Sequence, residues 1–258
     1  MQSLSARRAA FRALHAEGCF VLPNPWDIGG ARRLQAQGFQ ALASTSAGVA
    51  WSLGRDDGEL SRGEVLAHLE ALVAATDLPV NADFEAGFAD APDEVAANVA
   101  LAVATGVAGL SIEDRTGKEL YELPLAVERI RASREAIDRS GEDVLLVGRT
   151  EGFLIGRTGL DATLERLTAY AAAGADVLYA PGVSDPEAIR AIVQAVAPKP
   201  VNVLLWRPEM RVAELAALGV RRVSVGGFLA RAAWAGFAEA ARQLHDEGSL
   251  PASLFPRR

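Results

Sequence analysis

Two short runs of the chain each end in acidic side chains directly after an apolar stretch. The first ends with Asp83 and Glu85, and the second ends with Glu113. A helical pattern over residues 93–104 separates them, so the runs are expected to be neighbouring parallel strands whose acidic ends meet at one edge of a sheet. Carboxylates crowded there repel each other unless a positive charge lies between them. A divalent cation with oxygen ligands is the simplest such charge, so Asp83, Glu85 and Glu113 are predicted to bind Mg²⁺.

These acidic groups also have a purely structural explanation. Aspartate caps helix N-termini, and carboxylates form salt bridges with nearby arginines. Taken singly, Glu85, Asp114 and Arg115 fit that explanation as well as they fit a site, whereas Asp83 and Glu113 together favour the metal.

A guanidinium is predicted at the same edge. Arg149 follows an apolar strand at residues 144–147 and can hold a substrate carboxylate as a two-pronged donor. The alternative is that Arg149 only forms a salt bridge with Glu113 or Glu151.

Five further residues are candidates for substrate binding or proton transfer. Thr45, Ser46 and Ala47 follow another strand, and their hydroxyl and backbone N–H groups can donate to an oxyanion. Asn202 supplies an amide from a later strand. Asp57 lies in the long loop above the same edge, where it or a metal-bound water would transfer protons. With the metal and the guanidinium, these groups would bind a small 2-oxo acid.

The elements that must position these groups alternate along the whole chain. Every expected strand is followed by a helical pattern, which predicts a (β/α)₈ barrel as one domain over residues 1–258. A leading helix capped by Ser3 or Ser5 precedes the barrel, and a long helix to about His245 ends it. An open doubly wound sheet would need a Gly-x-Gly-x-x-Gly turn after the first strand, which the sequence lacks. The eight strands are expected near residues 20–22, 41–43, 78–83, 107–112, 144–147, 176–179, 200–204 and 222–225.

A metal-chelated 2-oxo acid suggests enolate chemistry, because the cation polarises the ketone and stabilises the enolate formed when an adjacent bond breaks. Schiff-base chemistry would reach a similar intermediate but needs a lysine at a strand end. The two lysines of the chain, Lys118 and Lys199, lie in a loop and before a strand.

The amino-acid composition argues against several other classes of protein. The 258 residues are 50% hydrophobic with a net charge of −7 and no basic stripe, so nucleic acid is not an expected partner. Cys19 is the only cysteine, which excludes a disulfide framework. His15, His68 and His245 are expected on helix surfaces. No apolar run is long enough for a membrane span, and the start does not resemble a signal peptide, so a cytoplasmic protein is expected.

The candidate residues lie in motifs that resemble the isocitrate lyase/phosphoenolpyruvate mutase superfamily. The resemblance runs from about Pro23 to Ala233, and each motif is specific only in combination with the others. The matching pieces are Ser44-Thr45-Ser46-Ala47-Gly48, Gly54-Arg55-Asp56-Asp57, Ala82-Asp83-Phe84-Glu85-Ala86-Gly87, Ser111-Ile112-Glu113-Asp114-Arg115, Gly148-Arg149-Thr150-Glu151, and the run from Leu215 to Gly227.

The resemblance implies a fold, a cofactor and a reaction class. It implies an α/β barrel, commonly a homotetramer in which the last helix packs on a neighbouring subunit. It implies Mg²⁺ near Asp83 and Glu113, an oxo acid held by Arg149 and the Thr45–Ser46 turn, and Asp57 above the substrate. Members cleave or form C–C or P–C bonds beside a pyruvate enolate.

Three departures from the family pattern reduce the range of reactions that we expect this chain to catalyse. The usual Asp-x-Asp of the third strand reads Asn81-Ala82-Asp83, with Glu85 as a possible compensation. The loop at residues 116–120 lacks the cysteine of the isocitrate-cleaving members. Arg115 replaces the lysine of the phosphonate-processing members. A carbon–carbon lyase or decarboxylase for oxaloacetate-like or isocitrate-like acids is therefore the main expectation.

Three alternatives are kept. One is a P–C bond enzyme of the phosphoenolpyruvate mutase or phosphonopyruvate hydrolase type. Another is a phosphate-handling barrel in which Val225-Gly226-Gly227 forms a phosphate nest, although close packing by glycine explains that run as well. The last is a vestigial 2-oxo acid binder without turnover. Whether residues 116–122 close as a lid is left open.

Overall fold

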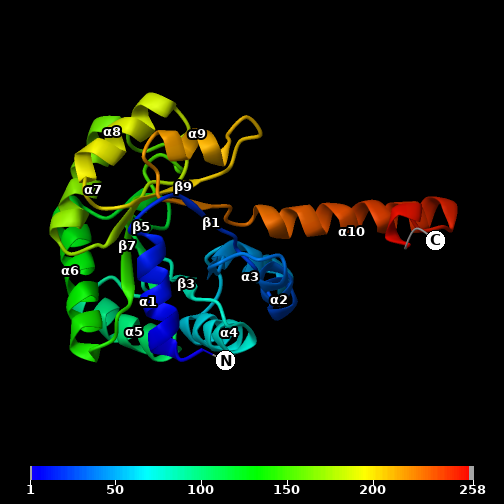
Figure 1. Cartoon of the computed structure of the whole chain (residues 1–258), viewed down its shortest axis with the longest axis horizontal. Coiled ribbons are helices and arrows are strands. Elements are labelled where there is room, and N and C mark those ends of the chain that lie inside the picture. The colour runs from blue at the N-terminus through cyan, green and yellow to red at the C-terminus, as the bar shows by residue number, and fades with distance from the viewer. Residues whose placement is uncertain (1, 256–258) are drawn as a thin grey trace.

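A parallel eight-stranded barrel forms the centre of the computed structural model, which describes residues 2–255 (Figure 1). Within that range the strand order is β1-β10-β9-β8-β7-β4-β3-β2, and every hydrogen-bonded neighbour is parallel. This order confirms the predicted (β/α)₈ barrel. The strands are β1 (Phe20–Leu22), β2 (Leu42–Ala43), β3 (Val80–Asp83), β4 (Gly109–Glu113), β7 (Leu145–Arg149), β8 (Val177–Tyr179), β9 (Val201–Leu204) and β10 (Arg222–Ser224).

Helices surround the strands, as the alternating pattern predicts. Local signals start several of them: Ser61 and Glu64 form a reciprocal capping box, and prolines occupy the first turns of α5, α6 and α8. The helices are α1 (Leu4–Leu14), α2 (Ile28–Ala36), α3 (Ser46–Ser52), α4 (Arg62–Ala75), α5 (Pro92–Ala104), α6 (Leu123–Ser140), α7 (Leu160–Ala172), α8 (Pro186–Val196), α9 (Val212–Ala217) and α10 (Phe228–Glu247), followed by a 3₁₀ turn, Ala252–Leu254.

Two loop predictions need correction. The segment after β2 is not irregular throughout, because Thr45 caps the short helix α3 by accepting a hydrogen bond from the N–H of Gly48 at 3.3 Å. The segment after β4 contains a small antiparallel hairpin, β5 (Arg115–Thr116) and β6 (Glu119–Leu120). A two-residue turn at Lys118 and Gly117, with φ of 60° at the glycine, makes this hairpin possible.

Helix α1 closes the N-terminal end of the barrel. Phe11 is fully buried among the first residues of several strands, including Phe20, and the guanidinium of Arg8 donates to the carbonyl of Val107. His15, expected on a helix surface, is 8% exposed. It is buried because its ring packs edge-on against Phe11 and Phe20, at centroid distances of 4.7 and 5.0 Å.

The barrel has a seam between β1 and β2, which share no ladder. The N–H of Ala43 donates to the carbonyl of Pro23 at 3.0 Å. Asn24 joins three strand ends there: its Nδ2 donates to the carbonyl of Ser44, and its Oδ1 accepts from the N–H groups of Val225 and Gly226, each at 2.9 Å. A single amide side chain therefore fastens the end of β1 to the ends of β2 and β10.

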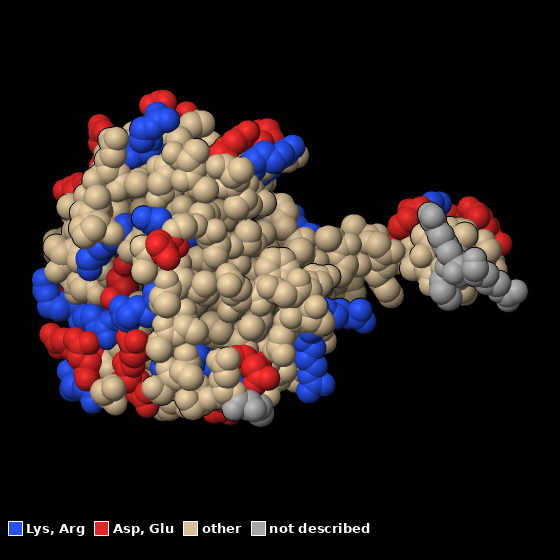
Figure 2. All heavy atoms as spheres, in the orientation of Figure 1, with Lys and Arg blue, Asp and Glu red and all other residues tan. Residues whose placement is uncertain are grey.

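Helix α10 leaves the barrel and projects away from it (Figure 1). Of its twenty residues, Ala230 alone is buried. Figure 2 shows this helix as a narrow extension whose stretch near the barrel carries few charges. In residues 2–255 no helix combines the length and the apolar character that crossing a membrane requires.

Candidate active site

The predicted site residues gather at the carboxyl ends of the strands, around two adjoining hollows. The inner hollow, of about 320 Å³, extends into the barrel, and the outer one, of about 420 Å³, lies beside β5 and β6. Both are lined by Ser46, Asp57 and Arg149. The remaining candidates divide between the two: Thr45, Ala47, Asp83 and Asn202 line the inner hollow, and Glu85 and Glu113 line the outer one.

Arg149 lies at the centre of the acidic cluster. Its Nη1 donates to Asp83 at 3.1 Å, and its Nε donates to Glu151 at 2.6 Å and lies 3.3 Å from Glu113. Burial works against its charge, but Glu151, Glu113 and Asp83 outweigh that effect and raise the pKa of Arg149. The guanidinium therefore stays charged and supplies the positive charge that the neighbouring carboxylates need.

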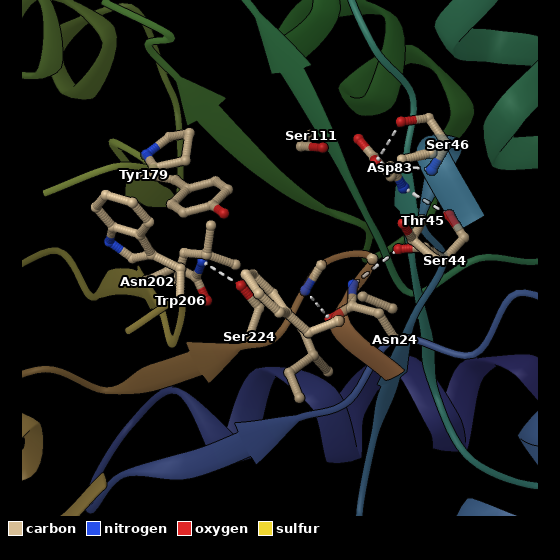
Figure 3. A pocket seen from close by; sticks show the side chains of 18 of the residues that line it. Asn24, Ser44, Thr45, Ser46, Asp83, Ser111, Tyr179, Asn202, Trp206 and Ser224 are labelled. Carbon is tan, nitrogen blue, oxygen red and sulfur yellow. Dashed lines mark hydrogen bonds between the residues drawn. The ribbon is translucent and has the colours of Figure 1, made fainter. Parts of the chain in front are cut away.

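Asp83 is fixed by groups that were expected to bind substrate. Its Oδ2 accepts hydrogen bonds from both the N–H and the hydroxyl of Ser46, each at 3.0 Å, while its own N–H donates to Ser44 Oγ (Figure 3). Thr45 uses its hydroxyl as the cap of α3. In this arrangement Ser46 orients Asp83 directly.

Glu85 differs from the other carboxylates in its backbone and its surroundings. It has φ of 48°, a left-handed conformation that is uncommon for a side chain of this kind. Its Oε1 is buried and has no hydrogen-bond partner. Burial, followed by the charges of Asp83 and Asp57, raises the pKa of Glu85 to about 7. Glu85 is thus a carboxylate that a cation would stabilise.

Two other acidic groups also hold protons more tightly than usual. Burial is the largest cause of a pKa for Glu113 well above the ordinary value; Arg149 opposes the shift, and Glu151 adds to it. Desolvation within the mouth, and then the charge of Asp83, raise the pKa of Asp57. A raised pKa brings the proton affinity of each group closer to the range in which proton transfer at neutral pH is efficient.

The donor set of the mouth can be tested for Mg²⁺. Asp83, Glu85 and Glu113 offer only oxygen donors, which this ion prefers, and the unpartnered Oε1 of Glu85 suits a cation. Residues 2–255 do not, however, contain a group of three acidic, histidine or cysteine side chains already spaced to hold a metal. Mg²⁺ usually keeps several waters and needs few direct protein ligands. The chemistry of the residues therefore fits Mg²⁺, although they do not form a closed cage.

Asn81, the amide in place of the first carboxylate of the Asp-x-Asp pattern, lies one step deeper in the barrel than Asp83. It precedes Asp83 by two residues on β3, so both face the barrel interior at different depths. Its amide oxygen accepts from Arg222 at 3.3 Å. Asp83 and Glu85, rather than Asn81, form the acidic pair at the mouth.

Several residues of the site had no clear sequence signal. Glu151 was noticed only as a possible partner of Arg149, yet it is 1% exposed and forms the shortest hydrogen bond to that guanidinium. Buried Asp114 supports Glu151 by accepting its N–H at 2.9 Å, and Tyr170 donates to the other oxygen of Asp114 at 2.6 Å. The position of Asp114 next to Glu113 was the one sequence signal for this residue. No sequence signal pointed to Tyr170.

A family model described as phosphoenolpyruvate phosphomutase matches residues 11–245 of the chain. The chain belongs to the phosphoenolpyruvate mutase/isocitrate lyase superfamily. This confirms the family resemblance inferred from the strand-end motifs.

Two solved structures and one curated protein are similar to this chain over most of its length. A crystal structure of a Burkholderia cenocepacia J2315 protein, whose class is given only as lyase or mutase, is 47% identical with a TM-score of 0.94, over 99% of this chain and 93% of that one. The structure of oxaloacetate acetylhydrolase with its product oxalate is 27% identical with a TM-score of 0.90, over 99% and 93%. The 2-methylisocitrate lyase of Escherichia coli K12 is 31% identical, over 75% of this chain and 68% of its own.

Proposed function

We propose that this protein is a Mg²⁺-dependent carbon–carbon lyase or decarboxylase for small 2-oxo or 2-hydroxy dicarboxylates. One observation carries the proposal: a charged, half-buried guanidinium, Arg149, lies among Asp83, Glu113 and Glu151 at the mouth of the barrel. Named relatives act on acids of this kind, since oxaloacetate acetylhydrolase has been seen with oxalate and another relative is a 2-methylisocitrate lyase.

The proposed roles follow from the contacts. Nη2 of Arg149 donates no hydrogen bond in the part of the chain described, so it is available to a substrate carboxylate. Asp83, Glu85 and Glu113 would hold Mg²⁺, which when bound supplies the charge that stabilises an enolate oxygen. The Thr45–Ala47 turn and Asn202 line the same hollow and would orient the acid.

Asp57 is proposed as the proton-transferring group. It lines both hollows, and its raised pKa keeps it closer to neutral pH than an ordinary aspartate. The walls contributed by Trp206, Leu154 and Tyr179 would limit the access of bulk water to a carbanionic intermediate.

The proposal is tested by a substrate screen. Purified protein is mixed with 2-oxo and 2-hydroxy dicarboxylates, with Mg²⁺ or with EDTA, and release of pyruvate or glyoxylate is followed. We expect Mg²⁺-dependent turnover of at least one acid.

Asp57→Asn should lower kcat by about 10²-fold or more while oxalate still binds, because proton transfer contributes about 10²–10⁴-fold. Glu59→Gln, a change of an exposed acid in the same loop, serves as the matched control.

The same screen separates the alternatives. Turnover of phosphonopyruvate, without turnover of the dicarboxylates, would identify the P–C bond enzyme. Ligand-induced stabilisation by 2-oxo acids without any turnover would identify the vestigial binder. The phosphate-nest alternative has lost its main support, because the N–H groups of Val225 and Gly226 already donate to Asn24.

A homo-oligomer, a tetramer with exchange of C-terminal helices, is part of the proposal. Helix α10 exposes large apolar side chains that the barrel does not cover, namely Phe228, Trp234, Phe237 and Leu244, with exposed fractions of 43, 43, 65 and 52%. Burying such residues on a second copy of the chain would be favourable, by about 25 cal/mol for each Å² of apolar surface covered.

A further inference from the structure

The inner hollow continues below the acidic mouth into the barrel. Ser111 and Asn81 line it, and each precedes a mouth carboxylate by two residues on its strand, so they lie one level deeper. Ser224 and Asn202 face the same space from the opposite strands (Figure 3). Its volume of about 320 Å³ is typical of a pocket that binds a small ligand. The hollow is therefore a shaft that leads from the mouth into the barrel, with polar groups among its apolar walls.

A second guanidinium lines the deep part of this shaft. Arg222 begins β10, is 2% exposed and lines the inner hollow. Its Nε donates to Asn202 Oδ1 at 2.9 Å, and its Nη1 donates to Asn81 Oδ1 at 3.3 Å and lies 3.5 Å from His15 Nε2. Its Nη2 donates no hydrogen bond within residues 2–255.

Arg222 contrasts with Arg149 in its charge balance. Arg149 has three carboxylates within 4 Å, whereas no carboxylate of residues 2–255 lies within that distance of Arg222. Burial lowers the pKa of Arg222 to about 10, with Tyr179 acting in the opposite sense, so the group is still a cation at neutral pH. A buried cation without an anion is costly, and neutral amide oxygens offset only part of that cost.

The two ends of the shaft have opposite electrostatic characters. Five carboxylates line the mouth, Asp57, Asp83, Glu85, Glu113 and Glu151, against the guanidiniums of Arg149 and Arg115. Arg231 lines the inner hollow beside Trp51. Negative groups therefore outnumber positive ones at the mouth. A second acid group of a substrate would be repelled there. At the deep end it would meet a cation, two amides and two hydroxyls.

We propose that Arg222 is the specificity-determining residue of the site and binds the distal carboxylate of a dicarboxylate at the floor of the shaft. The 2-oxo or 2-hydroxy acid end of the same molecule then lies at the mouth beside Arg149. This inference rests on the proposed function and adds to it the orientation of the substrate and the requirement for a second acid group.

Binding of length-matched acids tests this assignment in the full-length protein with Mg²⁺ present. Isothermal titration compares 2-oxoglutarate with 2-oxovalerate and malate with 2-hydroxybutyrate, so that each pair differs only in the distal group. Oxalate, which has no distal group beyond the chelating acid, reports on the mouth alone. We expect the wild type to prefer the dicarboxylate of at least one pair by about tenfold or more, the range of a charge-assisted hydrogen bond.

Arg222→Gln removes the charge and keeps a hydrogen-bonding side chain, which is shorter than that of arginine. It should reduce the preference to within about twofold while oxalate affinity changes less than about threefold. Arg222→Lys keeps the charge with a shorter reach and should retain part of the preference; it replaces the glutamine variant if that one does not fold by circular dichroism. Arg207→Gln removes an exposed guanidinium that stacks on Trp206, and it should keep the full preference.

The outcomes separate this inference from the proposed function. Oxalate binding with no dicarboxylate preference in the wild type, or a preference that survives in folded Arg222→Gln, would overturn the role of Arg222 and leave the mouth intact. Failure of oxalate and of every 2-oxo acid to bind the wild type would overturn the proposed function together with the inference.

Discussion

At the scale of single residues, the charge balance of Arg149 controls the mouth of the barrel. Glu151 and Asp83 hold the guanidinium through Nε and Nη1, which leaves its other terminal nitrogen for a ligand. Ser46 and Ser44 fix Asp83 in turn. A substrate carboxylate would therefore meet a preorganised donor, whose orientation costs nothing at the moment of binding.

Replacement of Arg149 by alanine tests this view. Because the variant removes a charge-assisted pair and leaves carboxylates facing an anionic ligand, oxalate should bind about 2–4 kcal/mol more weakly. Titration calorimetry in Mg²⁺ measures the loss. Arg157→Ala, at an exposed arginine that pairs with Glu119, should bind oxalate as the wild type does. Unchanged affinity in a folded Arg149→Ala protein would remove this residue from the substrate site.

At the scale of elements, the seam between β1 and β2 depends on Asn24. The buried side chain satisfies one carbonyl and two N–H groups from the ends of β2 and β10. Asn24→Ala would leave these groups unpaired, at about 1–3 kcal/mol for a buried unsatisfied group. The free energy of unfolding in urea should fall by about 2 kcal/mol. A change below about 0.5 kcal/mol would mean that water replaces the amide without loss.

Helix α1 introduces a pH dependence through His15. Burial, then the charge of Arg222, lower the pKa of this histidine to about 3, whereas the unfolded chain has the ordinary value of about 6.5. Between these values the unfolded state binds more protons, so the stability from His15 is present above pH 6.5 and is lost as the pH falls.

His15→Gln should remove this dependence. The free energy of unfolding of the wild type should decrease by about 1 kcal/mol more than that of the variant when the pH falls from 7.5 to 5.5. Urea titrations at the two pH values measure the difference. His245→Gln, at an exposed histidine on α10, is the control and should behave like the wild type. Equal pH dependence in His15→Gln and the wild type would show that another group is responsible.

At the scale of the whole molecule, the projecting α10 is the feature that one chain alone leaves unexplained. Its exposed Trp234 and Phe237 stack edge-on at 5.7 Å and form a small apolar surface on the projecting helix. Contact with further copies of the chain would cover this surface, which is the reason for the proposed oligomer.

Phe237→Glu would place a charge on that surface and should convert the oligomer to smaller species. Light scattering after size exclusion measures the mass. Glu239→Gln, a nearby change of an exposed acid that pairs with Arg242, should leave the mass unchanged. A monomeric wild type at micromolar concentration would contradict the proposed assembly.

The barrel and the residues gathered at its mouth could be predicted from the sequence, whereas the residues at the deep end of the inner hollow could not. Asp83, Glu113 and Arg149 could be placed because each ends an apolar strand, and parallel strands bring such ends together. Arg222 was expected at the start of the eighth strand, but no local pattern indicates that a charged side chain there lines the barrel interior. The burial of His15 depends on Phe20, a tertiary contact with no local pattern.

The strained backbone and the unpartnered carboxylate of Glu85 set protein stability against catalytic activity. Its left-handed backbone would suit glycine better, and holding another residue there costs about 1 kcal/mol or more. The buried, unpartnered oxygen adds a further penalty. Glu85→Gly should therefore raise the free energy of unfolding while removing a carboxylate from the mouth. Selection for thermostability alone would favour this substitution, whereas selection for turnover would oppose it.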